Sequence, residues 1–206
     1  TAMIGSPDQL AVSRLTLTNF RNYAQGRLEV DGRPVVLTGA NGVGKTNLLE
    51  ALSFLVPGRG LRRAKLSEIG RRSASTDAFG AEWAVAAKLR VGENDMEIGT
   101  GIEVSETPNG RDKRVIKIDG TVMKSQAELG RYTSAQWLAP QMDRLFQESG
   151  SARRRFVDRL VIGMDPEHAS TVAAYEQSLR SRNRLLREGA SDAAWYAAVE
   201  DSMARH

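Results

Sequence analysis

Residues 39–46 have the residue types and the spacing of a phosphate-binding loop. They read Gly39-Ala40-Asn41-Gly42-Val43-Gly44-Lys45-Thr46, which fits G-x-x-x-x-G-K-[ST] at every fixed position. Glycine lets backbone N–H groups turn inward around an anion, in conformations that a side chain would hinder. Lys45 suits the β- and γ-phosphates, and the Thr46 hydroxyl suits Mg²⁺. The loop therefore predicts that the chain binds a nucleoside triphosphate.

A phosphate-binding loop needs a strand before it and a helix after it, and the sequence indicates both. The apolar residues 35–37 are typical of a buried strand, and leucines recur at helical spacing at Leu48, Leu49, Leu52 and Leu55. Pro57 should end this helix, because proline cannot donate to the helical ladder. The helix start adds unpaired N–H groups and a positive dipole end. The alternative is a glycine-rich turn that merely contains a lysine, and the flanking elements favour the phosphate site.

The composition is that of a soluble globular protein. The 206 residues are 41% apolar and include no cysteine, which excludes disulfides and thiolate metal sites. No apolar stretch is long enough to cross a membrane, and residues 1–9 lack the pattern of a signal peptide. We therefore expect a cytoplasmic protein without a membrane partner.

Patterns outside the loop predict a largely antiparallel β region. Strands are expected at residues 12–18, 26–30, 83–91, 96–104 and 114–118. Turns are expected at residues 19–23, 92–95 and 108–110, with hairpin signals at Asp31-Gly32 and Asp119-Gly120. The first hairpin would lead into the strand at residues 35–37. A short helix at 125–132 and a buried strand at 134–138 complete the region.

Helices are predicted after residue 141, where the apolar period changes from two to 3.6. Ser151 is a candidate N-cap for a helix that runs to about Gly163. Asp165-Pro166 would cap and start a longer helix that stops at Gly189, and a third would begin near Ser191 or Asp192.

The expected organisation is a tail or cloning remnant at residues 1–9, an α/β head at 10–147 and a helical segment at 148–206. The run at residues 160–165 ends in aspartate, as a magnesium-binding strand does. It continues the helical pattern from Phe156, however, so a helix cap is the simpler interpretation of Asp165. His168 and His206 form no metal-ligand pattern.

Positive charge is concentrated after the phosphate-loop helix, although the net charge is only +4. Residues 58–76 contain a single acidic residue, Glu68, against six cations: Arg59, Arg62, Arg63, Lys65, Arg71 and Arg72. This segment is either a polyanion-binding surface or a solvated basic loop.

The segment Ala139-Pro140-Gln141 resembles the head of ATP-binding-cassette ATPases, in which a strand ends in a Pro-Gln pair. The resemblance implies that Gln141 reaches Mg²⁺ and the attacking water. The other interpretation is an exposed loop amide without a ligand.

The chain as a whole resembles the RecF family of recombination-repair ATPases, relatives of the structural-maintenance-of-chromosomes heads. The resemblance rests on LTLTNFRNY at residues 15–23, GANGVGKTNLLEAL at 39–52, APQ at 139–141, RRRFVD at 153–158 and YEQSLRSRNRLL at 175–186. It implies a P-loop fold of the ABC-ATPase-head type with an antiparallel β subdomain and a helical arm. Gln141 is a departure, because many members are expected to carry glutamate there.

The resemblance also implies a function and partners. It suggests an ATP- and Mg²⁺-dependent DNA-binding protein that acts at gaps, dimerises around two nucleotides and aids RecA loading with RecO and RecR. Residues 39–47, including Asn47, would bind the nucleotide, and Arg21 would either reach a phosphate or brace the first hairpin. The six cations would contact DNA, and the scarcity of aromatic residues among them favours a duplex backbone.

Arg153, Arg154 and Arg155 lie at an expected helix start, where the dipole disfavours cations. An anion should face them: Glu148 and Asp158 nearby, or else DNA or a partner chain.

The cassette arrangement places the acidic magnesium-binding strand and the signature segment after the helical arm, and neither pattern occurs in this chain. We therefore expect an N-terminal portion of a longer protein, with weak nucleotide binding and little turnover by this chain alone. A weak ATPase is implied for the full-length dimer. A transporter-type ATPase subunit and a P-loop nucleotide kinase remain as alternatives.

Overall fold

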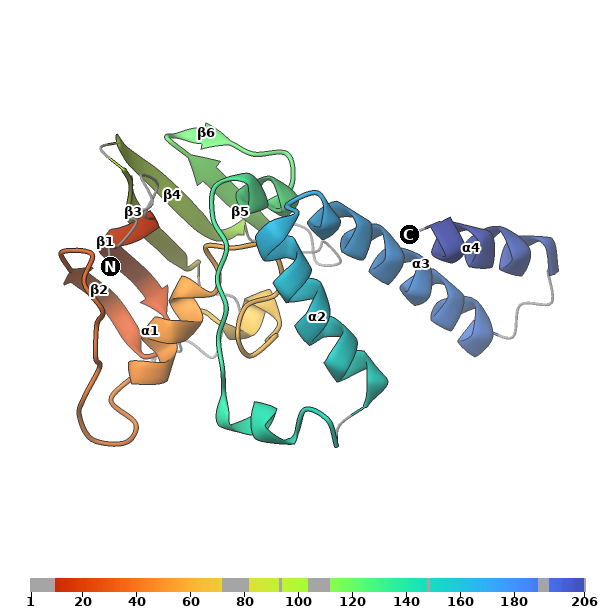
Figure 1. Cartoon of the computed structure of the whole chain (residues 1–206), viewed down its shortest axis with the longest axis horizontal. Helices are drawn as coiled ribbons and strands as arrows, with labels where there is room; N and C mark the ends of the chain where they lie inside the picture. The colour runs from red at the N-terminus through yellow and green to blue at the C-terminus, as the bar shows by residue number, and fades with distance from the viewer. Residues whose placement is uncertain are drawn as a thin grey trace, which may run out of the picture. The chain divides into compact units, whose positions relative to one another are not determined.

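The computed structural model describes residues 10–71, 82–92, 94–103, 112–147, 149–188 and 193–205. The chain forms two compact units, Thr1–Ala135 and Gln136–His206. A β-sheet with one short α-helix makes up the first unit, and three α-helices dominate the second (Figure 1). The expected tail at residues 1–9 lies outside the described residues, and the expected boundary after residue 147 stays a prediction.

Six strands form a single sheet in the first unit. They are β1 (Leu10–Phe20), β2 (Tyr23–Glu29), β3 (Ala84–Val91), β4 (Asn94–Glu103), β5 (Lys113–Ile118) and β6 (Thr121–Val122). Their order is β2-β1-β3-β4-β5-β6, and every neighbouring pair is antiparallel. The predicted antiparallel region is thus confirmed, with strand ends that differ by a few residues.

Two turns show how local residues set the sheet. The hairpin at Asp119-Gly120 is confirmed, because both residues have positive φ angles, 46° and 78°, and join β5 to β6. The first turn is tighter than predicted: Phe20 pairs with Tyr23, so only Arg21 and Asn22 lie between β1 and β2. The predicted turn at residues 108–110 lies outside the described residues.

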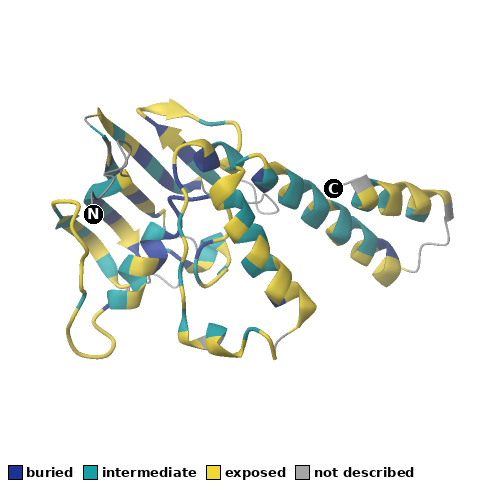
Figure 2. Cartoon of the chain, in the orientation of Figure 1, coloured by how far each residue is buried: buried dark blue, intermediate teal, exposed yellow. Residues whose placement is uncertain are grey.

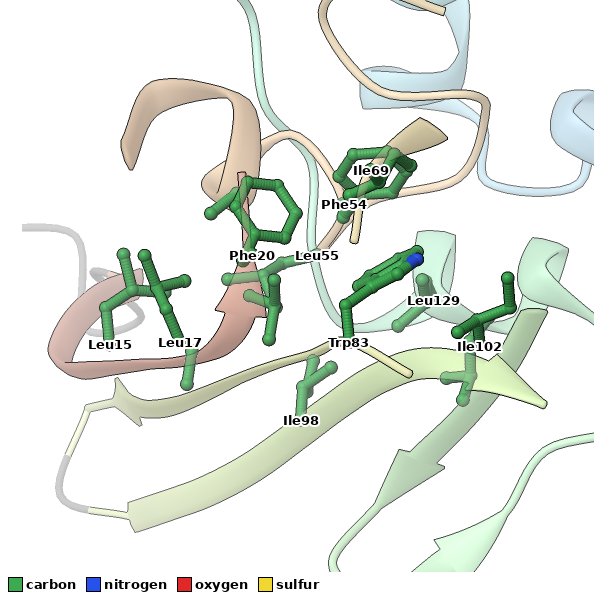
Figure 3. Close-up of a cluster of buried hydrophobic side chains, with 14 of the residues drawn as sticks. Leu15, Leu17, Phe20, Phe54, Leu55, Ile69, Trp83, Ile98, Ile102 and Leu129 are labelled. Atoms are coloured by element: carbon green, nitrogen blue, oxygen red, sulfur yellow. The ribbon is translucent and has the colours of Figure 1, made fainter. Parts of the chain in front are cut away.

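The core lies on one face of this sheet. Leu15 and Leu17 alternate with more exposed threonines along β1, as half-buried strands do. Phe20, Phe54 and Trp83 meet edge-on or tilted, with ring centroids 5.3 to 6.0 Å apart (Figure 3). Since Phe54 follows the phosphate loop in the chain, this aromatic cluster joins the loop's helix to the sheet.

Helix α1 (Lys45–Leu52) follows the loop and ends five residues before Pro57. The chain then tightens into bonds from Phe54 N–H to the Ala51 carbonyl and from Leu55 N–H to the Leu52 carbonyl. Leu55 is therefore buried beyond the helix, and Pro57 does not determine the helix end. Two short 3₁₀ helices, η1 (Leu66–Glu68) and η2 (Gln126–Arg131), complete the unit, the second close to the helix predicted at 125–132.

Two predicted strands are wrong. Residues 35–37 and 134–138 are irregular, and Val36 and Leu138 are 83% and 86% exposed. A strand needs a neighbour to pair its backbone groups, and within the described residues the only sheet is the antiparallel one, which includes neither segment. The hairpin predicted at Asp31-Gly32 is wrong for the same reason, because no strand follows it to pair with β2.

The second unit contains η3 (Pro140–Arg144), α2 (Gly150–Met164), α3 (His168–Glu188) and α4 (Ala193–Arg205). The N-cap of α2 is Ser149, two residues before the predicted Ser151. Asp165 accepts a hydrogen bond from the Glu167 N–H at 3.0 Å, and residues 160–164 are helical, which confirms that this run is no strand. Gly189, Ser191 and Asp192 lie outside the described residues.

Burial differs between the two units (Figure 2). The sheet unit has a continuous hydrophobic core, whereas the buried apolar residues of the helical unit are Ala152, Ala169 and Leu185. Among the helices that the structure describes, none is both long and apolar enough to cross a membrane.

Candidate phosphate-binding site

The loop at residues 39–46 requires glycine at Gly44. Its φ is 110°, a left-handed conformation that side chains rarely adopt, and a β-carbon there would lie 2.7 Å from Asn22 Nδ2 and 2.8 Å from Tyr23 Oη. Gly42, with φ of 87°, faces open space. The loop is thus tightly held at its end and open at its centre, where an anion would approach.

Lys45 folds back across this loop from the first position of α1. Its ammonium group donates to the carbonyls of Gly39 and Ala40, both at 2.7 Å. Thr46 is exposed beside it, and the first turn of α1 contains no acidic residue to repel a phosphate. The lysine ammonium therefore lies against the loop, and the exposed Thr46 follows it in the first turn of α1.

The turn between β1 and β2 supports the loop through two asparagines. Asn22 Nδ2 donates to the Val43 carbonyl at 3.2 Å, and Asn47 Nδ2 donates to Asn22 Oδ1 at 2.7 Å. Asn47 was predicted to contact the nucleotide, and in this structure its side-chain amide instead joins α1 to the turn. Its nucleotide contact stays a prediction.

Glu50 is a functional candidate that the sequence analysis missed. It is fully buried in α1 and receives Arg21 Nε at 2.9 Å, Arg21 Nη2 at 2.6 Å and Arg62 Nη1 at 2.6 Å. A carboxylate within the apolar run at residues 48–52 was the available signal, because a buried charge needs a partner. Its partners are distant in sequence, so the pattern could not name them.

Arg21 braces the first hairpin, one of its two predicted roles. Besides Glu50, its Nη1 donates to the Glu68 carbonyl at 2.9 Å, and its backbone N–H donates to the Ile69 carbonyl at 2.9 Å. Its φ of 55° places it in the left-handed region, which is unusual for a residue with a long side chain. The alternative role, a phosphate contact, stays a prediction.

The basic segment, defined here as residues 58–71, presents five exposed cations: Arg59, Arg62, Arg63, Lys65 and Arg71. It is anchored near its end, where Arg71 N–H donates to the Asn19 carbonyl at 2.7 Å and Gly70 bridges to Phe20. Arg72, the sixth predicted cation, lies outside the described residues. The segment is therefore a basic loop attached to the same turn that supports the phosphate loop.

Arg114 of β5 fixes the start of this segment. It donates to the carbonyls of Phe54 and Gly58, the latter at 2.7 Å, to Gln126 Oε1 at 2.9 Å and to the Thr100 hydroxyl at 2.9 Å. Burial lowers the pKa of its guanidinium to about 10, because the interior disfavours the charged form. This arginine is a structural clamp that the sequence analysis did not single out.

Gln141 lies in η3 of the second unit, directly after Pro140. Its role in positioning water and Mg²⁺ stays a prediction. Within the described residues no cluster of three histidine, aspartate or glutamate side chains could hold a metal ion.

Of the three arginines at the start of α2, Arg154 has a tyrosine as its partner, and the acids predicted to face the group stay a prediction for Arg153 and Arg155. Arg154 Nη1 donates to Tyr175 Oη at 2.9 Å and stacks on its ring at 4.7 Å. Asp158 instead pairs with His168 at 3.1 Å. Glu148, the other predicted acid, lies outside the described residues.

Comparisons with known proteins give a consistent result. Residues 11–141 match the family model described as the RecF/RecN/SMC N terminal domain. The DNA replication and repair protein RecF of Rhizobium johnstonii is 48% identical over 198 residues, which cover 96% of this chain and 51% of that protein. RecF of Allorhizobium ampelinum is 48% identical over 194 residues, covering 94% of this chain and 50% of that protein.

Solved structures agree. One of the recombination mediator protein RecF-ATP in the RecFOR pathway superposes with a TM-score of 0.77 at 25% identity, covering 99% of this chain and 52% of that one. A second solved structure, of RecF-ATPrS, superposes with a TM-score of 0.76 at 26% identity. The match covers 95% of this chain and 50% of that one. The chain spans about half the length of the curated relatives that it matches.

Proposed function

Because the chain belongs to the family of RecF/RecN/SMC N-terminal domains and has the fold of an ABC-type P-loop ATPase head, we propose that it binds ATP and serves DNA repair. The observation that carries the proposal is the arrangement of Gly44, Lys45 and Thr46 around an open loop at the start of α1. The names of the relatives favour a repair protein over a transporter subunit or a nucleotide kinase.

The nucleotide would be held by residues 39–47. Lys45 already binds two loop carbonyls, so its ammonium lies where it can exchange one of them for a phosphate oxygen. The exposed hydroxyl of Thr46 is a hard oxygen donor, which fits Mg²⁺, an ion that protein sites usually hold by few side chains together with substrate phosphates. Bound Mg²⁺ would supply neutralisation of phosphate charge. Gln141 would orient the attacking water.

DNA is the partner that we propose for the basic segment. Arg59, Arg62, Arg63, Lys65 and Arg71 are exposed along one short loop, and such cations bind a phosphate backbone by releasing its counterions. In the whole protein we propose an ATP-dependent homodimer that binds DNA at gaps and aids RecA loading with RecO and RecR. The similarity to RecF over nearly all of this chain supports these partners.

The test uses the whole protein and its Lys45→Met variant. Binding to duplex and gapped DNA is measured by fluorescence anisotropy, with and without ATP and Mg²⁺. We expect ATP to strengthen DNA binding in the parent and to have no effect in Lys45→Met, because the variant loses the charge that faces the phosphates. If ATP does not strengthen binding in the parent, or still does so in the variant, the proposed function is wrong.

A further inference from the structure

Glu50 is one carboxylate shared by two arginines. Its side chain is 1% exposed, Arg21 holds both of its oxygens, and Arg62 holds one of them. A buried carboxylate cannot exchange a lost partner for water, so breaking either contact is costly. The positions of Arg21 and Arg62 are therefore tied to each other through Glu50.

Both arginines connect Glu50 to the basic segment, each at a different place. Arg62 belongs to the segment itself, and 42% of its side chain is exposed to solvent, so a phosphate can reach it. Arg21 reaches the other end of the segment through the Glu68 carbonyl and, by its backbone, through Ile69. Glu50 thus holds the segment at two points.

The same network leads to the phosphate loop. Arg62 Nη1 also donates to Asn47 Oδ1 at 2.7 Å, and Asn47 is bonded to Asn22, which is bonded to the Val43 carbonyl of the loop. A hydrogen-bonded series therefore runs from Val43 through Asn22, Asn47 and Arg62 to Glu50. Its members lie on three different elements: the loop with its helix, the β1–β2 turn and the basic segment.

The turn in this network is held under strain. Asn19 and Arg21 have φ angles of 47° and 55°, in the left-handed region. Non-glycine residues remain in such conformations only where the surrounding contacts hold them. Arg21 is held by its contacts to Glu50, Glu68 and Ile69, and the Asn19 carbonyl accepts from the Arg71 N–H, so a change at any of these contacts alters what holds the chain there.

We propose that Glu50 is a positioning residue that couples the phosphate loop to the basic segment, so that nucleotide and DNA strengthen each other's binding. The proposal rests on the proposed function, which names the two ligands. A nucleotide that moves Val43 shifts Asn22 and Asn47, and these set where Arg62 lies. DNA phosphates that bind Arg62 and move it act on the phosphate loop through the same contacts.

The first test compares two arginines of the basic segment. Arg62→Gln removes the contacts with Glu50 and Asn47, whereas Arg59→Gln removes an equal charge from a residue that has no hydrogen bond or ion pair among the described residues. The readout is the ratio of duplex-DNA affinities with and without ATP. We expect a ratio of about 5 to 150 in the parent, as is typical of coupled sites.

Arg62→Gln should bring this ratio close to one. Arg59→Gln should weaken DNA binding with and without ATP alike and keep the ratio of the parent. If Arg62→Gln keeps the ratio, or Arg59→Gln loses it equally, Glu50 has no coupling role, although ATP-dependent DNA binding in the parent would still support the proposed function. A ratio of one in the parent overturns both.

The second test uses reciprocity. Coupling requires DNA to raise ATP affinity by the same factor by which ATP raises DNA affinity. ATP affinity is measured by isothermal titration calorimetry with and without a saturating duplex, in the parent and in Glu50→Gln. We expect the variant to bind ATP without the gain from DNA. A gain equal to that of the parent contradicts the proposal. If Glu50→Gln does not fold, the gain from DNA is measured in Arg62→Gln, which breaks the network at its contacts with Glu50 and Asn47, and a gain equal to that of the parent contradicts the proposal there too.

Discussion

A β-carbon on Gly44 would lie 2.8 Å from the hydroxyl oxygen of Tyr23 and 2.7 Å from the amide nitrogen of Asn22. The turn between β1 and β2 therefore stands directly behind the phosphate loop and leaves no room for a side chain. This contact makes the loop depend on a turn that lies 21 residues earlier in the chain.

Gly44→Ala should weaken nucleotide binding more than Gly42→Ala does. Both variants strain a left-handed backbone, at a cost of about 1–3 kcal/mol, but only the first also displaces Asn22 and Tyr23. The measurement is the affinity for a fluorescent ATP analogue. Gly42→Ala is the matched control, because its new methyl group meets no atom within 4 Å. An equal or larger loss in Gly42→Ala would show that the contact behind Gly44 is unimportant.

Arg114→Met should destabilise the sheet unit. It leaves the buried acceptors at Phe54 and Thr100 without their donor, and each such group costs about 1–3 kcal/mol. Urea unfolding followed by circular dichroism measures the change. Arg27→Met is the control, since Arg27 is exposed and pairs only locally with Glu29, so its loss should stay within about 0.5 kcal/mol. Similar urea midpoints for the two variants would rule out a clamp at Arg114.

The ion pair between Asp95 and Lys88 predicts a dependence on pH. The hydrogen bond from Lys88, at 2.6 Å, lowers the pKa of Asp95 below its ordinary value of 3.8. Because the folded-state pKa is the lower one, the stabilisation is present above the ordinary value and is lost as the pH falls through the folded value. The difference in urea midpoint between the parent and Asp95→Asn should therefore be constant at neutral pH and shrink below about pH 4.

Lys88→Met serves as the control for that experiment. With its partner removed, the pKa of Asp95 should return toward its ordinary value, which NMR titration of the carboxyl group can follow. An unchanged Asp95 titration in Lys88→Met would contradict the assigned cause.

Salt dependence distinguishes phosphate contacts from other effects of the basic segment. Each phosphate contact contributes about −0.9 to the slope of log affinity against log salt concentration for duplex DNA. Arg59→Gln should thus make the slope of the parent shallower by about one contact. Arg27→Gln, which removes an exposed cation from β2, should leave the slope unchanged. Equal slopes for Arg59→Gln and the parent would place Arg59 away from the DNA backbone.

The sequence predicted what depends on short-range patterns. Leu15 and Leu17 alternate with threonines, and the glycines and Lys45 stand at fixed spacing, so β1 and the phosphate loop were identified. Asp119-Gly120 was likewise sufficient to predict its hairpin, because both residues accept the left-handed backbone that the turn requires.

Features that depend on distant partners could not be predicted in this way. The apolar run at residues 35–37 has the composition of a strand, but pairing requires a neighbour that the composition does not reveal. Glu50 seemed to be one polar residue in a leucine-rich helix, because its partners lie 29 residues before it and 12 after it. The role of Arg114 could not be predicted for the same reason, since it contacts residues up to 60 positions away.

Trp83 is an intrinsic fluorescence probe of the basic segment. Its indole N–H donates to the Leu66 carbonyl at 3.0 Å, and its ring is 2% exposed between Phe20 and Phe54. The emission of this tryptophan therefore reports whether the basic segment is attached to the aromatic core. With Trp137 and Trp195 replaced by phenylalanine, Trp83 would be the one tryptophan left among these 206 residues, and its emission would follow that attachment in real time as nucleotide or DNA is added, without any attached dye.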